Sequence, residues 1–360
     1  MNPDGFLADV LDEPATLAHV LAQTDQADAP LADLAARIGR ARLVVLIGMG
    51  SSRFAALTAA AHLRARGIAA VVEYASTDLP TVPAPDVLAV GISATGNSAE
   101  TVAALARHHG TSATAAITNH AQGGKLGAVA DLVVPLHAGV EAGGVACKSF
   151  QATLAVLLRA SGIPTSALAP AAEAQATLIE SRRTWLDPVL DLFADAPTVY
   201  AIAPASRISS ALQSALMLRE GPRIPADAAE TGDWSHVDVY LTKHPNYRAL
   251  LFGGSPWDGE ALEWLRQREA CSAAPSPALP STSPTPTPRT RSSPPWSTSP
   301  SPSSPPRRGG AGASTPTPCP RAATAARVPE DASGGICSPE VDRRAARRSG
   351  SSCRSGSARR

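Results

Sequence analysis

A short apolar run that ends in a turn rich in hydroxyl side chains most constrains what this chain can fold into. Residues 87–92 (Val-Leu-Ala-Val-Gly-Ile) are apolar and rich in β-branched side chains, which is typical of a buried strand. The alanine-rich residues 99–109 favour a helix, and the turn 93–98 (Ser-Ala-Thr-Gly-Asn-Ser) lies between the two. Because the first amide groups of a helix have no intrahelical partner, this unit predicts an anion-binding corner.

The same alternation of strand and helix runs through the first 160 residues. We expect strands at 43–47, 68–73, 87–92, 113–118 and 132–135, and helices at 53–66, 98–109, 123–130 and 148–161. Before residue 40, apolar positions at helical spacing are interrupted by Pro14 and Pro30, which predicts two or three short helices. Alternating elements of this kind are typical of an α/β fold, a doubly wound parallel sheet with helices on both faces.

The pattern starts again after a linker helix that we expect from Pro170 to about Leu192. Strands are expected at 198–203 and 248–252, and helices at 206–219 and 258–268. The next strand should follow Arg268 within a few residues, but the sequence continues Cys-Ser-Ala-Ala-Pro-Ser-Pro. We therefore expect a second α/β unit in tandem with the first, but incomplete.

Composition changes sharply after residue 270. The last 90 residues hold 17 of the 33 prolines and no lysine, and their 13 arginines face four acidic residues. Their net charge is thus +9, against −8 for the rest of the chain. Such a segment cannot bury enough apolar surface to offset chain entropy, so we expect disorder. A basic arm for nucleic acid is one interpretation, and an out-of-frame translation of GC-rich codons is the one we favour.

These patterns divide the chain into five segments. They are an N-terminal helical segment (1–40), a first α/β domain (41–165), a linker helix (166–192), a truncated second domain (193–270) and the tail (271–360). The sequence lacks a signal peptide and an apolar stretch that could span a membrane, so we expect a cytoplasmic protein. Cys147 is the one cysteine before residue 271, and the tail cysteines do not have zinc-site spacing, so we expect no bound metal.

The sequence matches two phosphate-binding motifs only in part. Residues 48–53 (Gly-Met-Gly-Ser-Ser-Arg), with Glu73 after the next strand, resemble a dinucleotide fingerprint, but Arg53 replaces its third glycine. Residues 144–149 suggest a phosphate loop, but Cys147 stands where that loop needs glycine. We therefore disfavour both a nicotinamide or flavin enzyme and a nucleoside triphosphatase.

Five hydroxyl side chains follow two strands that should end at the same sheet edge. They are Ser51, Ser52, Ser93, Thr95 and Ser98. One hydroxyl is enough to cap a helix, a contribution of about 1 kcal/mol. The surplus favours a bound oxyanion, because ligands of such sheets lie beyond the carboxyl ends of the strands.

The order of motifs resembles the sugar isomerase (SIS) family of phosphosugar-binding domains, and within it the isomerase half of glucosamine-6-phosphate synthase. The motifs are Asp12-Glu-Pro14, Gly50-Ser-Ser52, 93–98, Ala138-Gly-Val-Glu141, 144–150, Leu216-Met-Leu-Arg-Glu220 and Gly232-Asp-Trp-Ser-His236. The resemblance implies tandem SIS domains whose hydroxyls hold a sugar phosphate. It also implies Glu220 as the base that moves a proton between C1 and C2, His236 as the ring-opening group, a homodimer, and no metal or redox cofactor.

The sequence departs from that family pattern at several positions. It holds no glutaminase domain, Met217 stands for an expected lysine, Ala94 for an amide, and 237–238 (Val-Asp) for Gly-Pro. A C-terminal active-site lysine also has no counterpart. We therefore expect an isomerase or isomerase-deaminase of a hexose or amino-sugar phosphate, of the fructose 6-phosphate or glucosamine 6-phosphate type. The alternative is a non-catalytic module that senses a phosphosugar.

Overall fold

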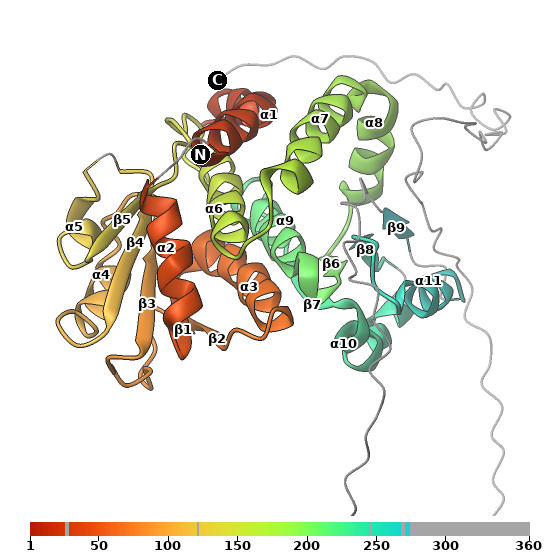
Figure 1. The fold of residues 1–360 in the computed structure, drawn as a ribbon. Coiled ribbons are helices and arrows are strands. Elements are labelled where there is room, and N and C mark those ends of the chain that lie inside the picture. Colours follow the sequence, from red (N-terminus) through yellow and green to blue (C-terminus); the bar gives the residue numbers. More distant parts are fainter. Residues whose placement is uncertain (26–28, 121, 245, 268–270, 274–360) are drawn as a thin grey trace, which may run out of the picture.

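The structure is a computed structural model of the chain, and it describes residues 1–25, 29–120, 122–244, 246–267 and 271–273. Its first sheet consists of β1 (Leu43–Gly48), β2 (Ala70–Tyr74), β3 (Val87–Ile92), β4 (Ala113–Thr118) and β5 (Leu132–Pro135). The strands are all parallel and lie in the order β2-β1-β3-β4-β5 (Figure 1). This order confirms the predicted doubly wound sheet.

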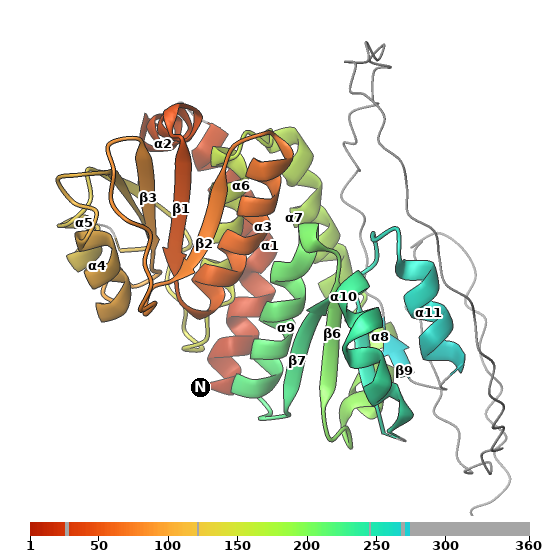
Figure 2. The ribbon, with the colours of Figure 1, turned by 90° about the horizontal axis from the view of Figure 1, so that it is seen from below.

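Helices cover both faces of the first sheet, so this unit has three layers (Figure 2). On one face lie α4 (Ala99–Ala106) and α5 (Gly124–Gly127), with Leu105 and Leu126 fully buried against the sheet. On the other lie α2 (Ala29–Arg40), α3 (Gly50–Ala65) and α6 (Lys148–Ala160). The core therefore lies on both sides of β1, β3 and β4, which leaves the strand ends and the loops after them to form a site.

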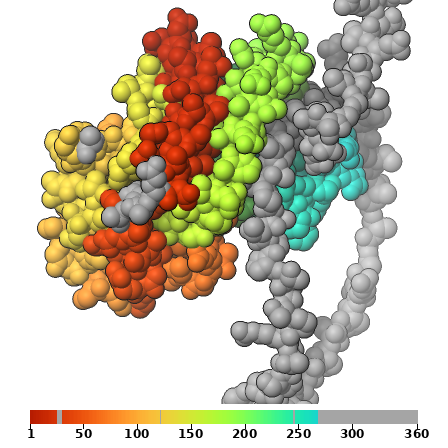
Figure 3. Space-filling view, turned by 45° about the horizontal axis from the view of Figure 1, so that its top comes forward, coloured from red at the N-terminus to blue at the C-terminus, as the bar shows by residue number. Residues whose placement is uncertain are grey.

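The N-terminal helix differs from the expectation. A single helix, α1 (Pro3–Asp25), continues through Pro14, and Pro30 lies in the first turn of α2. A proline in the first turn removes no helical hydrogen bond, but an internal one does. The internal loss is offset because α1 buries Leu17, Val20 and Leu21 in the core and packs on α6 and α7 (Thr165–Glu180). In the space-filling view α1 (red) lies between yellow residues of the first unit and the green α7 (Figure 3).

The linker is two helices rather than one. Helix α7 ends at Glu180 and α8 (Arg182–Phe193) follows after Ser181. The Ser181 hydroxyl and the Trp185 indole N–H both donate to the carbonyl of Leu178, at 3.2 and 3.1 Å. These bonds satisfy a carbonyl at the end of α7 that a continuing helix would have used, so the chain turns there (Figure 1).

The second sheet has the order β7-β6-β8-β9, also parallel. Its strands are β6 (Val199–Ala203), β7 (Ala226–Glu230), β8 (Arg248–Leu251) and β9 (Cys271–Ala273). The strand expected after Arg268 is therefore present as β9, although residues 271–360 carry no strand pattern in the sequence. The predicted disorder of the remaining tail lies outside the described residues, and the division into domains stays a prediction.

The second sheet also has helices on both faces. Helix α9 (Ile208–Glu220) covers one face, and α10 (Thr231–His236) and α11 (Asp258–Gln267) cover the other, where Trp234 is fully buried. The two units meet where α9 packs on α3. There the Thr58 hydroxyl donates to Ser209 Oγ at 2.9 Å, and Gln213 Nε2 donates to the carbonyl of Ala146 at 2.7 Å.

Candidate functional site

The corner after β1 presents Ser51 and Ser52 in the first turn of α3. Glycine suits position 48, because a Cβ there would lie 3.1 Å from the backbone nitrogen of Arg53, a tight contact. Helix α3 begins without a side-chain cap. Within the described part of the chain the hydroxyls of Ser51 and Ser52 make no hydrogen bond, and both residues are half-buried. This corner therefore offers free amides and free hydroxyls together.

The corner after β3 uses some of its hydroxyls internally. Ser98 is the N-cap of α4 and accepts from the Thr101 N–H at 3.4 Å, and Thr95 Oγ1 accepts from the Asn97 N–H at 3.2 Å. Ser93 is buried, and its hydroxyl has no partner among the described residues. Gly96 has φ +66, and a Cβ there would lie 2.7 Å from a backbone oxygen, so the turn needs glycine.

These two corners are neighbours in space. Strands β1 and β3 pair directly, with Ile47 opposite Gly91, so the turns after them leave the same edge side by side. Strand order reverses between β1 and β3, since β2 follows β1 in sequence but lies on its other side. Ligands of doubly wound sheets lie in the crevice at such a switch point. Ser51, Ser52, Ser93, Thr95 and Ser98 thus all come to one sheet edge.

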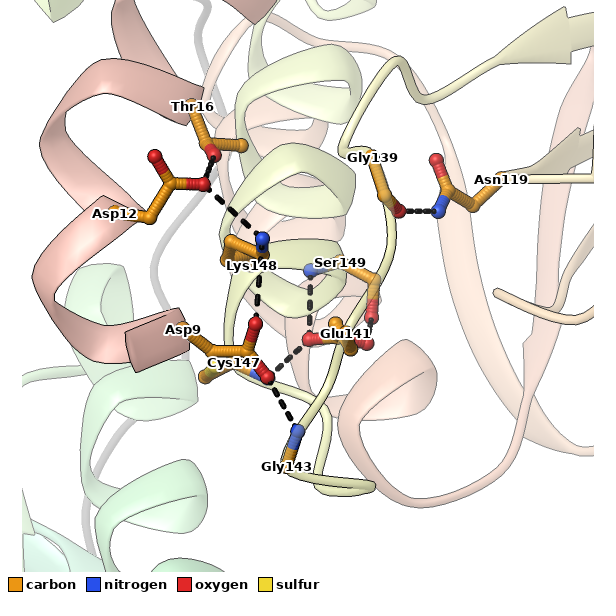
Figure 4. A network of polar contacts seen from close by, with 10 residues as sticks. All are labelled: Asp9, Asp12, Thr16, Asn119, Gly139, Glu141, Gly143, Cys147, Lys148 and Ser149. Carbon is orange, nitrogen blue, oxygen red and sulfur yellow. Dashed lines mark hydrogen bonds and ion pairs between the residues drawn. The ribbon is translucent and has the colours of Figure 1, made fainter. Parts of the chain in front are cut away.

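A third corner, at the start of α6, is occupied by the chain's own carboxylate. Glu141 Oε1 accepts from the N–H groups of Cys147 (2.6 Å) and Ser149 (3.1 Å), and its Oε2 accepts from the Ser149 hydroxyl (2.6 Å). Figure 4 shows the carboxylate aimed into this helix N-terminus. The residues that imitate a phosphate loop are therefore already satisfied by an internal anion.

A buried ion pair holds α1 against α6 at that corner (Figure 4). Lys148 Nζ lies 3.3 Å from Asp9 and 3.1 Å from the half-exposed Asp12, and Asp9 accepts from the Gly143 N–H at 2.7 Å. Burial works to raise the pKa of Asp9, but its bonds from backbone N–H groups and from Lys148 outweigh burial and lower it. Burial likewise works to lower the pKa of Lys148, and the two carboxylates raise it. Both groups are charged, and their role is structural.

Two further groups beside this corner have shifted pKa values. Burial, with the charges of Glu141 and Asp9, raises the pKa of Glu13 to about 7. Burial, with the charges of Glu13, Glu141 and Asp9, raises the pKa of the Cys147 thiol to about 12, so it is an unreactive thiol. Glu13 is half-buried and accepts from Gln175 Nε2 at 3.3 Å.

The two residues proposed for proton transfer lie at opposite ends of β7. Glu220 is exposed at the end of α9, and the next residue, Gly221, lies beside Met1. The residue after Met1, Asn2, donates its backbone N–H to the carbonyl of Gly143. This end of α9 is thus close to the segment that follows β5. His236 is exposed at the end of α10, which starts only after β7. Figures 1 and 2 both show α10 apart from the N-terminal end of α1. One chain does not bring Glu220 and His236 together.

A hollow of about 1000 Å³ opens at the carboxyl edge of β3, β4 and β5. Its lining is His19, Ala94, Thr95, Asn97, Asn119, His120, Pro135, His137, Gly139, Val140 and Glu141. Of the hydroxyl residues singled out from the sequence, Thr95 alone lines it. Sequence reasoning missed its histidines, although His120 and His137 follow directly after strands.

The fold and its corners define an α/β protein whose two hydroxyl-bearing corners meet at the switch point of its first sheet. Residues 37–160 match the family model of the SIS domain. The match spans the first sheet and its helices, so this first unit is similar to a SIS domain.

Solved structures that resemble the chain cover both units. The C-terminal domain of glucosamine-fructose-6-phosphate aminotransferase from Francisella tularensis aligns with TM-score 0.64 and 19% identity over 75% of this chain and 82% of that one. Tagatose-6-phosphate ketose/aldose isomerase from Escherichia coli aligns with TM-score 0.62 and 19% identity, over 77% of this chain and 83% of that one. Glucosamine-6-phosphate deaminase from Thermotoga maritima aligns with TM-score 0.58 and 19% identity, over 76% of this chain and 85% of that one. At such identity the likeness establishes the fold.

Three further findings concern relatives, metal ligands and membrane helices. The sequence has no significant match among proteins of curated function. Among the described residues, no group of three His, Cys, Asp or Glu side chains is placed to hold a metal ion. The described helices include none that is both long and apolar enough to cross a bilayer.

Proposed function

We propose that this protein binds a hexose or amino-sugar phosphate and interconverts its aldose and ketose forms, with or without loss of the amino group. The observation that carries the proposal is the uncapped N-terminus of α3 beside unpartnered hydroxyls, at the switch point of a SIS domain. Solved structures with the same fold are named as a ketose/aldose isomerase and a deaminase of sugar 6-phosphates.

The phosphate is proposed to lie between the two corners. The hydroxyls that would donate to its oxygens are those of Ser51, Ser52, Ser93, Thr95 and Ser98. Hydrogen bonds to a charged acceptor contribute about 1.5 to 3 kcal/mol each, and the N-terminus of α3 adds a favourable field. Neither a metal nor a redox cofactor is needed for this binding or for proton transfer between carbons.

Proton transfer between C1 and C2 is proposed to use Glu220, and ring opening is proposed to use His236. A carboxylate and an imidazole are suited to proton transfer near neutral pH. Because β7 separates the two residues within one chain, both can serve one sugar only if a second copy supplies one of them. We therefore propose a homodimer, with the cytoplasm as its place of action.

The alternative function is a phosphosugar sensor without turnover. It is favoured by Met217, which stands on α9 one turn before Glu220 where the family pattern has a lysine. A sensor would keep the phosphate corners and lose only the proton-transfer groups.

One experiment separates these functions. Purified full-length chain is given fructose 6-phosphate or glucosamine 6-phosphate, and both thermal stabilisation and sugar interconversion are followed. We expect stabilisation with turnover, and we expect Glu220→Gln to abolish turnover while stabilisation remains. Glu180→Gln is the matched control, since Glu180 is also exposed at the end of a helix. Stabilisation without turnover would establish the sensor, and a fully active Glu220→Gln variant would overturn the assignment of the base.

A further inference from the structure

We propose that His19, His120 and His137 form an imidazole wall that recognises the carbohydrate part of the ligand, in the hollow beside Thr95. This inference rests on the proposed function and adds to it a second half of the binding site. The three residues come from α1, from the loop after β4 and from the loop after β5, yet all line the same hollow. The ring centroids of His19 and His137 are 6.5 Å apart, with the rings edge to face at 82°.

The nitrogens of these rings are available to a ligand. Within the described residues the imidazole rings of His19 and His137 make no hydrogen bond, and the ring of His120 makes one, from the Gln122 N–H to Nδ1 at 3.3 Å. A histidine that serves the core looks different: His108 is buried, and its Nδ1 lies 3.2 Å from Ser112 Oγ. Three rings on one hollow with free polar atoms are therefore not explained by packing.

The loops that carry two of the rings are held by one side chain. Asn119 Oδ1 accepts from the Ala138 N–H at 2.9 Å, and its Nδ2 donates to the carbonyl of Gly139 at 2.6 Å (Figure 4). His120 follows Asn119 directly and His137 precedes Ala138, so these bonds hold together the backbone segments that carry both rings. His137 has φ +53, a left-handed conformation that is strained for a side chain other than glycine. Such strain is retained where the surrounding structure imposes it, and it is common at binding sites.

The lining also decides what kind of ligand fits. The hollow's one carboxylate, Glu141, is engaged by the amides of α6, so it does not compete for donors. Imidazole N–H groups and the Thr95 hydroxyl therefore face the hollow without a free acid, which favours a ligand rich in hydroxyl or anionic oxygens. A volume of about 1000 Å³ is ample for a sugar, since ligand sites span roughly 300 to 1,000 Å³. Thr95 belongs to both the hollow and the phosphate corner, so a sugar phosphate can reach from one to the other.

The test compares a sugar phosphate with phosphate alone. The variants are His19→Gln, His120→Asn and His137→Asn, the last because asparagine tolerates a left-handed backbone. The matched control is His109→Gln, an exposed histidine that follows α4 at the opposite end of the sheet. Dissociation constants for fructose 6-phosphate, glucosamine 6-phosphate and inorganic phosphate are measured by calorimetry on the full-length chain.

We expect each wall variant to weaken sugar-phosphate binding roughly five- to tenfold, the loss of one ordinary hydrogen bond or more, and to leave inorganic phosphate unaffected. If the unsubstituted chain binds neither sugar phosphate, the proposed function itself fails. If it binds and all three variants bind equally well, or lose inorganic phosphate to the same degree, the imidazole wall is refuted. Should His137→Asn fail to fold by its thermal transition, the two variants on exposed residues decide the outcome.

Discussion

Helices α6 and α3 begin at the same edge of the first sheet, but their N-termini are satisfied in different ways. The amides of α6 are bonded to Glu141, which sits beside a buried ion pair between Lys148 and Asp9. Helix α3 has no side-chain cap, and Ser51 and Ser52 in its first turn have no partner within the described residues. One corner is closed by the chain itself and the other is open.

A helix N-terminus that belongs to the scaffold differs from one that binds a ligand in what accepts its hydrogen bonds. Both corners look like phosphate sites in sequence, because each joins a strand to a helix through glycine and hydroxyl residues. The orphan amides of a helix need an acceptor in either case. Where the chain supplies a carboxylate, the corner is part of the scaffold. Where it supplies only donors, the missing acceptor is expected to come from a ligand.

The largest effect should come from the closed corner. Lys148→Met leaves Asp9 as an unpaired buried charge, so the free energy of unfolding should fall by about 3 to 5 kcal/mol. Chemical denaturation measures this loss. The control is Asp12→Asn, which should cost about 1 kcal/mol or less because Asp12 is half-exposed. A Lys148→Met variant as stable as the control would show that the closed corner is not a structural anchor.

The next effect depends on pH. The pKa of Glu13 is raised to about 7 from an ordinary value of 4.5, so the folded state holds its proton more tightly than the unfolded state does. Its contribution is complete below pH 4.5 and is lost as the pH rises to about 7. Glu13→Gln should therefore be more stable than the unsubstituted chain by up to about 3 kcal/mol at pH 8, and equal to it near pH 4. A stability difference that does not change with pH would contradict the assigned shift.

The open corner should respond in affinity rather than in stability. The double variant Ser51→Ala with Ser52→Ala should bind fructose 6-phosphate more weakly by roughly a hundredfold or more, since two hydrogen bonds to a charged phosphate are removed, and should unfold at nearly the same denaturant concentration. Ser149→Ala in the closed corner is the matched control, and it should lose stability but keep affinity. Equal losses of affinity in both variants would erase the distinction between the corners.

The smallest effect concerns the corner after β3, which is partly closed. Ser98 caps α4, so Ser98→Ala should cost about 1 kcal/mol of stability, measured by thermal unfolding. Ser93→Ala removes a hydroxyl without a partner, so it should reduce stability less than Ser98→Ala does and reduce the affinity for fructose 6-phosphate more. If Ser93→Ala lost more stability and Ser98→Ala lost more affinity, the roles of cap and ligand contact would have to be exchanged between the two serines.

The sequence predicts the first unit better than the second, for physical reasons. The expected bounds of β3, β4 and β5 coincide with the observed ones because these strands are short runs of mainly apolar residues, and those of β3 and β4 are almost all buried in the sheet. Strand β7, with the sequence Ala-Asp-Ala-Ala-Glu, was missed because its acidic residues hide the strand pattern. Helix α1 continues through Pro14 because tertiary packing outweighs the local penalty of proline.

The candidate site shows the same limit. The hydroxyl turns were predictable because strand-to-helix corners follow from local pattern, and parallel strands bring their ends to one edge. The hollow was not predictable, since its wall joins His19 to His137 across more than a hundred residues of sequence. The separation of Glu220 from His236 depends on which end of β7 each adjoins, and β7 was the strand that the pattern concealed.

The most direct test of the contrast between corners is an experimental structure determined with fructose 6-phosphate. We predict that the phosphate oxygens lie within hydrogen-bond distance of the Ser52 and Ser93 hydroxyls and of the first amides of α3, while Glu141 keeps its bonds to α6. A phosphate found at the start of α6 with Glu141 displaced, or one that leaves the α3 corner empty, would contradict the account.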